Sequence, residues 1–377
     1  MLVVILKEAR QDESRVALMP DAVKALTAKG FSVAVESSAG LQSGASDDDY
    51  QSAGASISTD RAELLATADV VPVVNALPSE DQEKLKNGSV MIGFLRALDE
   101  PAALNTAVQR GVTLFSMELV PRITRAQSMD ALSSMATVTG YKAVIVAADH
   151  LPKLFPLLMT AAGTIPPAKV LVLGAGVAGL QAIATARRLG AVVEAYDVRA
   201  AAGEQIKSLG AKFIEVDLGG LQTEDKGGYA KELSPEALEL GRQAIARAAK
   251  ISDVVITTAQ VPGRRAPLMI PAAAVEDMRP GSIIFDLAAP AGGNCEVTKP
   301  GETVLYHGVT IFGPTNLAAE MPVHASMLYS RNVSNFLQLI LKNNELNIDR
   351  ADEIIAGSCV AFGGEIVNER VAAAKQA

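Results

Sequence analysis

The chain has 377 residues and a formal net charge of -8, with 34 Lys and Arg against 42 Asp and Glu. Apolar residues make up 49% and charged residues 20% of it, a globular mix that excludes a disordered, collagenous or coiled-coil protein. The acidic balance argues against a nucleic-acid-binding or anionic-membrane surface, since both need clustered Lys and Arg, and the length suggests two domains.

The N-terminal third of the chain alternates short apolar runs with helical segments, the βαβ pattern of a parallel sheet. A helix is expected to open at Pro20 and to stop at Gly30, a glycine C-terminal signal. Two further helices are expected over 79–86 and 101–109. The predicted strands are 2–6, 31–35, 69–74, 89–95 and 112–117.

A polar stretch at 121–128 follows, and a long Ala-rich helix is expected from near Asp130. A second βαβ series begins at Lys169. Its predicted strands are 170–173, 192–196, 213–216, 254–258, 283–287 and 310–312. The last strong helix, about 325–342, is long enough to cross back over the first series.

These elements predict an α/β protein of two Rossmann-like, doubly wound parallel-sheet domains, the first of them discontinuous. The expected domains are an N-terminal α/β domain made of 1–132 and 323–377, and a Rossmann domain at 133–322.

Several classes of site and location are argued against by what the sequence contains. Two cysteines, Cys295 and Cys359, cannot form a disulfide framework and are expected to be reduced thiols. Three scattered histidines argue against zinc, so no metal site is expected. We find no apolar run of about 18 residues and no signal peptide, so a soluble cytosolic protein is expected.

Residues 169–179 read KVLVLGAGVAG, a G-x-G-x-x-G motif directly after a strand and opening a helix. Gly174 permits the tight turn, Gly176 lets backbone N–H groups approach a pyrophosphate, and Gly179 lets the helix sit close to the strand. The motif therefore predicts a dinucleotide site, with a structural glycine turn as the alternative. The residues expected at the pyrophosphate are Gly174, Ala175, Gly176, Val177, Ala178 and Gly179.

The next strand ends at Asp197, 18 residues after Gly179. A carboxylate there accepts hydrogen bonds from the adenosine ribose hydroxyls and repels a 2′-phosphate, which favours NAD over NADP. Val198 and Arg199 follow in the same turn, and Arg199 could bind a 2′-phosphate instead, which leaves NADP open.

The nicotinamide end is expected near the carboxyl ends of later strands. Thr258 and Ala259 follow one strand and should face the ligand. Asn294, after a Gly pair, could hydrogen-bond a ribose or cap the turn.

Two polar segments offer further contacts. The donors of the stretch from Arg122 to Asp130 could reach the carboxamide and ribose of the nicotinamide half, or the stretch is a solvated loop with Ser128 or Asp130 as a helix N-cap. Gly pairs flank a segment that carries Tyr229, either a mobile flap over the site or a disordered loop.

At these residues the chain resembles the NAD(H)-binding component of proton-translocating nicotinamide nucleotide transhydrogenase, which is its domain I or the leading portion of its alpha subunit, within the alanine dehydrogenase/transhydrogenase superfamily. The resemblance covers essentially the whole chain. The stretches that carry it are KEARQDESRVALMPD, ELVPRITRAQSMDALSSMA, MTAAGTIPPAKVLVLGAGVAGLQAIATARRLGA, YDVRAA, GGYAKE, ITTAQVPGRRAPLMI and DLAAPAGGNC.

The resemblance implies direct hydride exchange, NADH + NADP⁺ giving NAD⁺ + NADPH, coupled to proton flow through a membrane component. It implies that the carboxamide and ribose of NAD(H) are held by Arg122, Gln127, Asp130 and Ser133. It assigns the mobile loop to Tyr229 and the ribose carboxylate to Asp197.

The resemblance also implies partners. The family is usually dimeric, and this chain has one dinucleotide fingerprint, so NADP(H) must be bound by a separate partner domain. We therefore expect a homodimer, peripheral on the cytoplasmic face of the membrane, that docks on the NADP(H)-binding and proton-channel subunits without entering the bilayer.

The alanine dehydrogenases resemble the chain too and are the main alternative. Their pattern places a substrate-carboxylate arginine at Arg15, a lysine where this chain has Asn75, and a histidine where it has Arg96. Pro290-Ala291 likewise stand where family members often carry a polar or acidic pair. Arginine is a poor proton-transfer catalyst near neutral pH, so amino-acid dehydrogenation is disfavoured. A non-catalytic NAD-binding protein is the third alternative.

Overall fold

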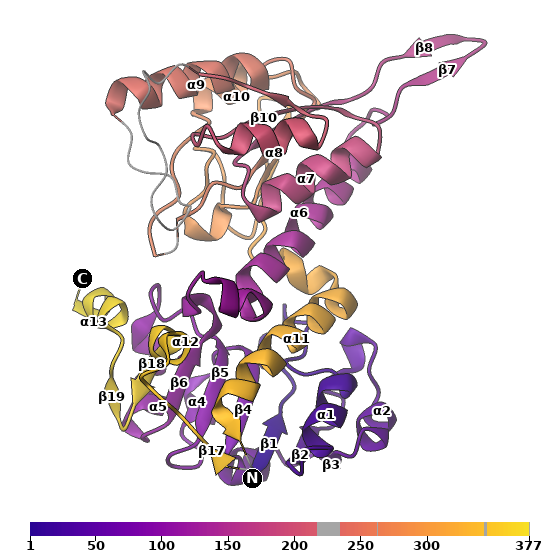
Figure 1. Cartoon of the computed structure of the whole chain (residues 1–377). Coiled ribbons are helices and arrows are strands. Elements are labelled where there is room, and N and C mark those ends of the chain that lie inside the picture. The colour runs from indigo at the N-terminus through magenta and orange to yellow at the C-terminus, as the bar shows by residue number, and fades with distance from the viewer. Residues whose placement is uncertain (217–233, 262, 343–344, 377) are drawn as a thin grey trace. The chain divides into compact units, whose positions relative to one another are not determined.

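The computed structural model describes residues 1–216, 234–261, 263–342 and 345–376. They form two compact units: unit 1 is Met1–Met135 with Ala318–Ala377, and unit 2 is Ala136–Leu317. Each unit has its own mainly parallel sheet (Figure 1). The predicted fold class is confirmed: an α/β protein with two Rossmann-like sheets, the first assembled from both ends of the chain.

The sheet of unit 1 has the strand order β19-β18-β6-β5-β4-β1-β2-β3. Its parallel part reads 3-2-1-4-5-6, the doubly wound order, and the order reverses between β1 and β4. The C-terminal strands β18 and β19 extend one edge in antiparallel fashion. The strands are β1 (Leu2–Ile5), β2 (Ser32–Glu36), β3 (Ser56–Ser58), β4 (Val70–Asn75), β5 (Val90–Phe94), β6 (Thr113–Ser116), β18 (Cys359–Phe362) and β19 (Glu365–Ile366).

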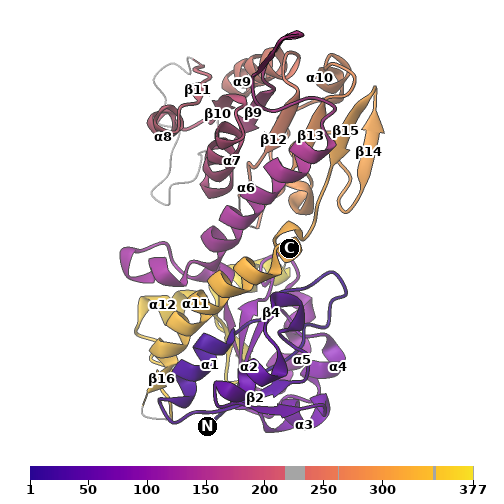
Figure 2. The same cartoon turned by 90° about the vertical axis from the view of Figure 1, so that its right-hand side faces the viewer.

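Unit 1 is closed by the C-terminal helix α11 (Pro322–Ile340), which lies beside α1 (Figure 2). Tyr329 on α11 is fully buried and donates its hydroxyl to the Val73 carbonyl at 2.8 Å. The other helices of the unit are α1 (Pro20–Thr27), α2 (Asp47–Ser52), α3 (Arg61–Thr67), α4 (Ser79–Gln82), α5 (Asn105–Gln109), α12 (Glu353–Ser358) and α13 (Glu369–Gln376).

The larger sheet of unit 2 has the order β11-β10-β9-β12-β13-β15-β14. Six strands again read 3-2-1-4-5-6, with antiparallel β14 at the edge. The reversal lies between β9 and β12, so the crevice in which doubly wound sheets bind ligands is at their carboxyl ends. The strands are β9 (Lys169–Leu173), β10 (Val192–Tyr196), β11 (Lys212–Phe213), β12 (Val254–Thr257), β13 (Ile283–Asp286), β14 (Thr303–Tyr306) and β15 (Val309–Phe312).

Helix α6 (Ala131–His150) begins in unit 1 and continues into unit 2. Within the described residues of the chain it is the one helix long and apolar enough to cross a membrane by length and composition. Its Ala143, Val144 and Ala147 are buried in the core of unit 2, as in a core helix. The helices that flank this sheet are α7 (Val177–Arg188), α8 (Ala202–Ser208), α9 (Pro235–Ala249) and α10 (Ala272–Glu276).

A hairpin of β7 (Leu158–Thr160) and β8 (Gly163–Ile165) projects from unit 2 (Figure 1). All six strand residues are exposed. At its base the Ala168 N–H donates to the Phe155 carbonyl at 3.0 Å. The sequence patterns did not predict this hairpin, because no buried face gives its strands an alternation.

Two predicted elements are wrong in extent. The helix expected over 79–86 ends at Gln82, whose buried side-chain amide donates to the carbonyls of Leu77 and Ala103. The strand expected over 213–216 is the two-residue β11. In both cases the predicted element extends beyond the last residue that has regular helical or strand hydrogen bonds.

Candidate functional site

The fingerprint turn of unit 2 joins β9 to α7 through backbone geometry that only glycine satisfies. Gly174 has φ +94°, and its N–H donates to the Tyr196 carbonyl at 2.8 Å. A Cβ on Gly179 would stand 1.8 Å from the Gly174 carbonyl oxygen. The Thr258 hydroxyl, at the carboxyl end of β12, donates to the same oxygen at 3.0 Å. The turn is therefore held closed at the point where the strand order reverses.

The first turn of α7 meets the requirements of an anion site. Gly176 is its N-cap and carries no side-chain cap, and a Cβ there would meet open space. Gly176 and Val177 are exposed, whereas Ala175 is buried. The N-terminal N–H groups of a helix carry partial positive charge. The residues present thus fit a pyrophosphate.

Asp197, directly after β10, is bound to the fingerprint and to a guanidinium. Its carboxylate is buried and accepts from the Ala175 N–H at 2.7 Å. Arg199 donates its backbone N–H at 2.8 Å and its Nε and Nη2 at 2.9 Å each. The acid predicted to bind a ribose and the arginine named as the alternative ligand of a 2′-phosphate are therefore in contact with each other. Val198 lies between them and is partly buried.

The loop after β12 is fixed by Asn294, which is fully buried. The Asn294 side-chain amide donates to the carbonyls of Ala259 and Pro267, at 2.9 and 2.8 Å. Its oxygen accepts from the Ala259 N–H at 3.0 Å. In this structure the side chain organises the loop that presents Thr258 and Ala259, and its contact with a ribose stays a prediction.

Asp286 supports the neighbouring loop; the sequence places it in a segment, 286–288, that is expected to face the ligand, but does not indicate the role of its side chain. It is fully buried at the end of β13. Its two oxygens accept from the hydroxyls of Thr257 and Thr298, at 2.7 Å each, and from three backbone N–H groups, those of Ala288, Asn294 and Cys295. Such a fully bonded carboxylate fixes the backbone around the crevice.

The polar segment at 122–133 belongs to unit 1. Residues Thr124–Met129 form a 3-10 helix, and Gln127 is exposed on it, as is Arg122 just before it. Asp130 takes the N-cap position of α6: its carboxylate accepts from the Ser133 N–H at 2.9 Å and from the Ser133 hydroxyl at 2.6 Å. The capping expectation for Asp130 is thus met, and its contact with a nicotinamide stays a prediction. Tyr229 lies outside the described residues.

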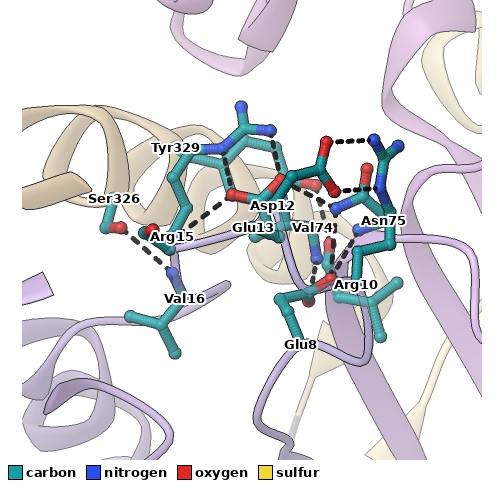
Figure 3. A network of polar contacts seen from close by, with 12 residues as sticks. Glu8, Arg10, Asp12, Glu13, Arg15, Val16, Val74, Asn75, Ser326 and Tyr329 are labelled. Carbon is teal, nitrogen blue, oxygen red and sulfur yellow. Dashed lines mark hydrogen bonds and ion pairs between the residues drawn. The ribbon is translucent and has the colours of Figure 1, made fainter. Parts of the chain in front are cut away.

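A buried polar cluster occupies the switch point of unit 1 (Figure 3). The carboxylate of Glu8 accepts from the backbone N–H groups of Val74 and Asn75, at 2.6 and 3.0 Å, and from the Asn75 side-chain amide at 3.2 Å. Burial raises the pKa of Glu8 to about 7, although these hydrogen bonds act in the opposite direction. The sequence patterns missed this residue, because its partners lie 66 and 67 positions away.

The second acid of the cluster, Glu13, is paired. Burial opposes its ionisation, but the side chain of Arg15 donates two hydrogen bonds of 2.7 Å and lowers the pKa of Glu13. Asn75 also donates to Glu13 at 2.9 Å. Figure 3 shows Arg15, the arginine of the alanine dehydrogenase pattern, directed at this internal carboxylate.

At the two strand ends where the alanine dehydrogenase pattern has a lysine and a histidine, this chain has Asn75 and Arg96. Asn75 is engaged with the two glutamates. Arg96 has the left-handed φ of +50° and pairs with Glu100 at 2.7 Å on the surface. An amide and a guanidinium are poor proton-transfer groups near neutral pH.

Comparison with known proteins agrees with this geometry. The sequence matches the family described as alanine dehydrogenase/PNT, its N-terminal domain over residues 4–139 and its C-terminal domain over 143–369. An NAD(P) transhydrogenase subunit alpha polypeptide of Rhodospirillum rubrum is 45% identical over 376 residues, 98% of each chain. The crystal structure of transhydrogenase from Sinorhizobium meliloti is 42% identical with a TM-score of 0.89, over 97% of this chain and 100% of that one. Alanine dehydrogenase of Mycobacterium tuberculosis is 27% identical, over 99% of this chain and 96% of that protein.

Proposed function

The chain belongs to the alanine dehydrogenase/PNT family, and from that premise we propose that it is the NAD(H)-binding subunit of a proton-translocating NAD(P)⁺ transhydrogenase. In this role it holds NAD(H) while a partner domain holds NADP(H), and hydride passes directly between the two nicotinamides. The similarity to transhydrogenase subunits supports the function at the level of the family. The detailed activity is our proposal.

The observation that carries the proposal is the fingerprint of unit 2. Gly174 and Gly179 close the turn, the N-terminus of α7 is open, and Asp197 lies one hydrogen bond from Ala175. Together these groups suit the pyrophosphate and adenosine ribose of a dinucleotide. The carboxylate favours NAD(H), since a 2′-phosphate would meet its charge.

The chemistry asked of the protein is positioning. The bound nicotinamides supply hydride donor and acceptor, NADH + NADP⁺ giving NAD⁺ + NADPH, and no protein acid or base is required. In our proposal Arg122, Gln127, Asp130 and Ser133 orient the carboxamide and ribose at the nicotinamide end. Orientation of this kind contributes to rate because the reacting groups must approach to roughly 3–3.5 Å.

We propose a homodimer, and the hairpin β7–β8 supports it. Its Met159 is 73% exposed, and Leu158 and Ile165 are more than a third exposed. A two-stranded hairpin alone is marginally stable in water, and a cluster of exposed apolar side chains suits a protein interface. A second copy of the chain would cover these residues.

The remaining partners follow from the transhydrogenase reaction. Coupling to proton translocation requires membrane-spanning proton-channel subunits in addition to the NADP(H)-binding domain. We propose that the chain docks on them at the cytoplasmic face of the membrane, as a peripheral subunit. This location and these partners rest on the family relationship.

The test measures binding and transfer separately. The purified chain should bind NADH in a fluorescence titration, and should reduce an NADP⁺ analogue only when the NADP(H)-binding domain is added. The control replaces that domain with L-alanine and NAD⁺. NADH production with alanine, or a failure to bind NADH, would contradict the proposal.

A further inference from the structure

The 3-10 segment Thr124–Met129 of unit 1 is an exposed polar segment that is nevertheless tightly fixed. Ala126 and Met129 are buried and face into the unit, three positions apart, which is the period of a 3-10 helix. Gln127 and Ser128, between them, are exposed. Two buried side chains alone give a six-residue surface segment few apolar contacts, and segments with few such contacts open readily. This segment is held in addition by two sets of polar contacts.

The first of these contacts is a two-pronged ion pair. Arg125 donates from Nη1 and Nη2 to the two carboxylate oxygens of Asp352, at 2.7 and 2.9 Å. Asp352 also caps α12 by accepting from the Ile354 N–H at 2.8 Å. The hydrogen bonds from the Arg125 guanidinium are the main cause that lowers the pKa of Asp352 to about 2. The carboxylate is therefore charged throughout the physiological pH range. Asp352 thus links the N-terminus of α12 to the segment 124–129.

The second contact is a pair of amides from α11. The side chains of Asn332 and Asn335 both donate to the Ser128 carbonyl oxygen, at 2.9 and 3.1 Å. They lie three positions apart on one face of the helix, so a single carbonyl receives two donors. Ser128 directly follows Gln127, so the backbone on both sides of Gln127 is restrained.

We propose that Asp352, Asn332 and Asn335 are positioning residues that hold the segment 124–129 in the conformation in which Gln127 and its neighbours bind the nicotinamide half of NAD(H). This inference rests on the proposed function, which assigns the nicotinamide end to that segment. None of the three residues contacts the dinucleotide in this account. They act by reducing the ordering cost of the segment when the ligand binds.

The contacts are poorly explained by stability alone. Half of the Arg125 side chain is exposed, and ion pairs at such sites contribute little to folding. The bidentate ion pair and the two converging amides instead fix the geometry of the segment 124–129. Pre-organised groups are what a binding site requires of its supporting residues.

The experiment compares NADH with ADP-ribose, which keeps the adenosine and pyrophosphate but lacks the nicotinamide. The variants are Asp352→Asn, which keeps an N-cap residue but removes the charge, and Asn335→Ala. The matched controls are Glu353→Gln, an exposed acid next to Asp352, and Gln338→Ala, an exposed amide on α11. Dissociation constants for both ligands are measured on the full chain, together with hydrogen–deuterium exchange of the peptide 122–133.

Each variant should raise the dissociation constant for NADH about three- to tenfold and leave that for ADP-ribose within about twofold. In the absence of ligand, hydrogen–deuterium exchange of the 122–133 peptide should be faster in each variant than in the unmodified chain. The two controls should behave as the unmodified chain. Arg125→Lys should bind NADH more weakly than the unmodified chain, because a single ammonium cannot form the bidentate pair with Asp352.

Equal weakening of NADH and ADP-ribose, or unchanged exchange in both variants, would overturn the inference. A Gln127→Ala variant separates this failure from failure of the proposed function. If Gln127→Ala leaves the ratio of the NADH dissociation constant to the ADP-ribose dissociation constant unchanged, the nicotinamide assignment of the segment is wrong, and the positioning role is wrong with it. If Gln127→Ala raises this ratio while Asp352→Asn and Asn335→Ala do not, only the positioning role is wrong.

Discussion

Replacing Glu8 by Gln should make the stability of unit 1 less dependent on pH. The Glu8 side chain is partly buried, and its partners are two backbone N–H groups and the neutral amide of Asn75. Other ionisable groups of the cluster are Glu13 with its Arg15, and Tyr329, which packs close by. Glu8 is therefore the acid of this cluster whose charge has no cationic hydrogen-bond partner among the contacts of the described residues.

The sign and size follow from its pKa. Burial raises the pKa of Glu8 from the ordinary 4.5 to about 7, so the folded state holds the proton more tightly than the unfolded state. The resulting stabilisation is complete below pH 4.5 and is lost as the pH rises through 7. At about 1.4 kcal/mol for each pH unit, the total is about 3 kcal/mol, of which about 2.5 kcal/mol is lost between about pH 5 and pH 8.

The assay is urea denaturation at about pH 5 and pH 8, followed by circular dichroism, on the unmodified chain and on Glu8→Gln. Glutamine adds a pH-independent cost, because its NH₂ group faces a backbone donor, so only the difference between the two pH values is compared. The unmodified chain should lose about 2.5 kcal/mol more than Glu8→Gln over this range. The control Glu83→Gln changes an exposed acid and should follow the unmodified chain. A pH dependence in Glu8→Gln within about 0.5 kcal/mol of the unmodified chain would show that Glu8 is not the titrating group.

Three further predictions concern unit 2. Gly140→Ala would place a Cβ 2.2 Å from the carbonyl oxygen of Ala178 in the first turn of α7, so NADH should bind about tenfold more weakly; Val144→Ala, a buried deletion on the same helix, should lower the melting temperature and leave binding unchanged. Asp197→Ala should reduce the preference for NADH over NADPH in paired titrations, and a preserved ratio would remove its assigned role. Asp286→Asn turns an NH₂ group towards its buried donors and should cost about 2–4 kcal/mol of unfolding free energy; a melting temperature equal to that of the unmodified chain would contradict this.

The parallel strands are the most predictable feature of the fold. The run 192–196, predicted as a strand, is β10 at the same residues, and 254–258 and 283–287 are β12 and β13 to within one residue. Strands buried on both faces, such as β12 and β13, read as short apolar runs rich in Val and Ile, a signal that a single sequence retains. The strand β14, at the edge of the unit 2 sheet, lacks that signal and was not predicted.

The site is predictable where its requirement is local. Gly174 and Gly179 are forced by a turn of six residues, so their spacing reveals them. The bond between Asn294 and Ala259, the contact of Glu8 with Asn75, and the ion pair of Arg125 with Asp352 join residues 35 to 227 positions apart. Such pairs depend on how strands and helices pack, and no spacing rule in the sequence indicates them.

We propose that this chain presents the nicotinamide of NAD(H) directly to a nicotinamide held by another chain. The proposal is tested by supplying NADH deuterated at the transferable C4 position, together with NADP⁺ and the NADP(H)-binding partner, and by analysing the products by mass spectrometry. Direct transfer requires that the deuterium is recovered in NADPH, with none released to water and no reaction when the partner is omitted. Deuterium released to solvent, or NADPH formed by the isolated chain, would contradict it.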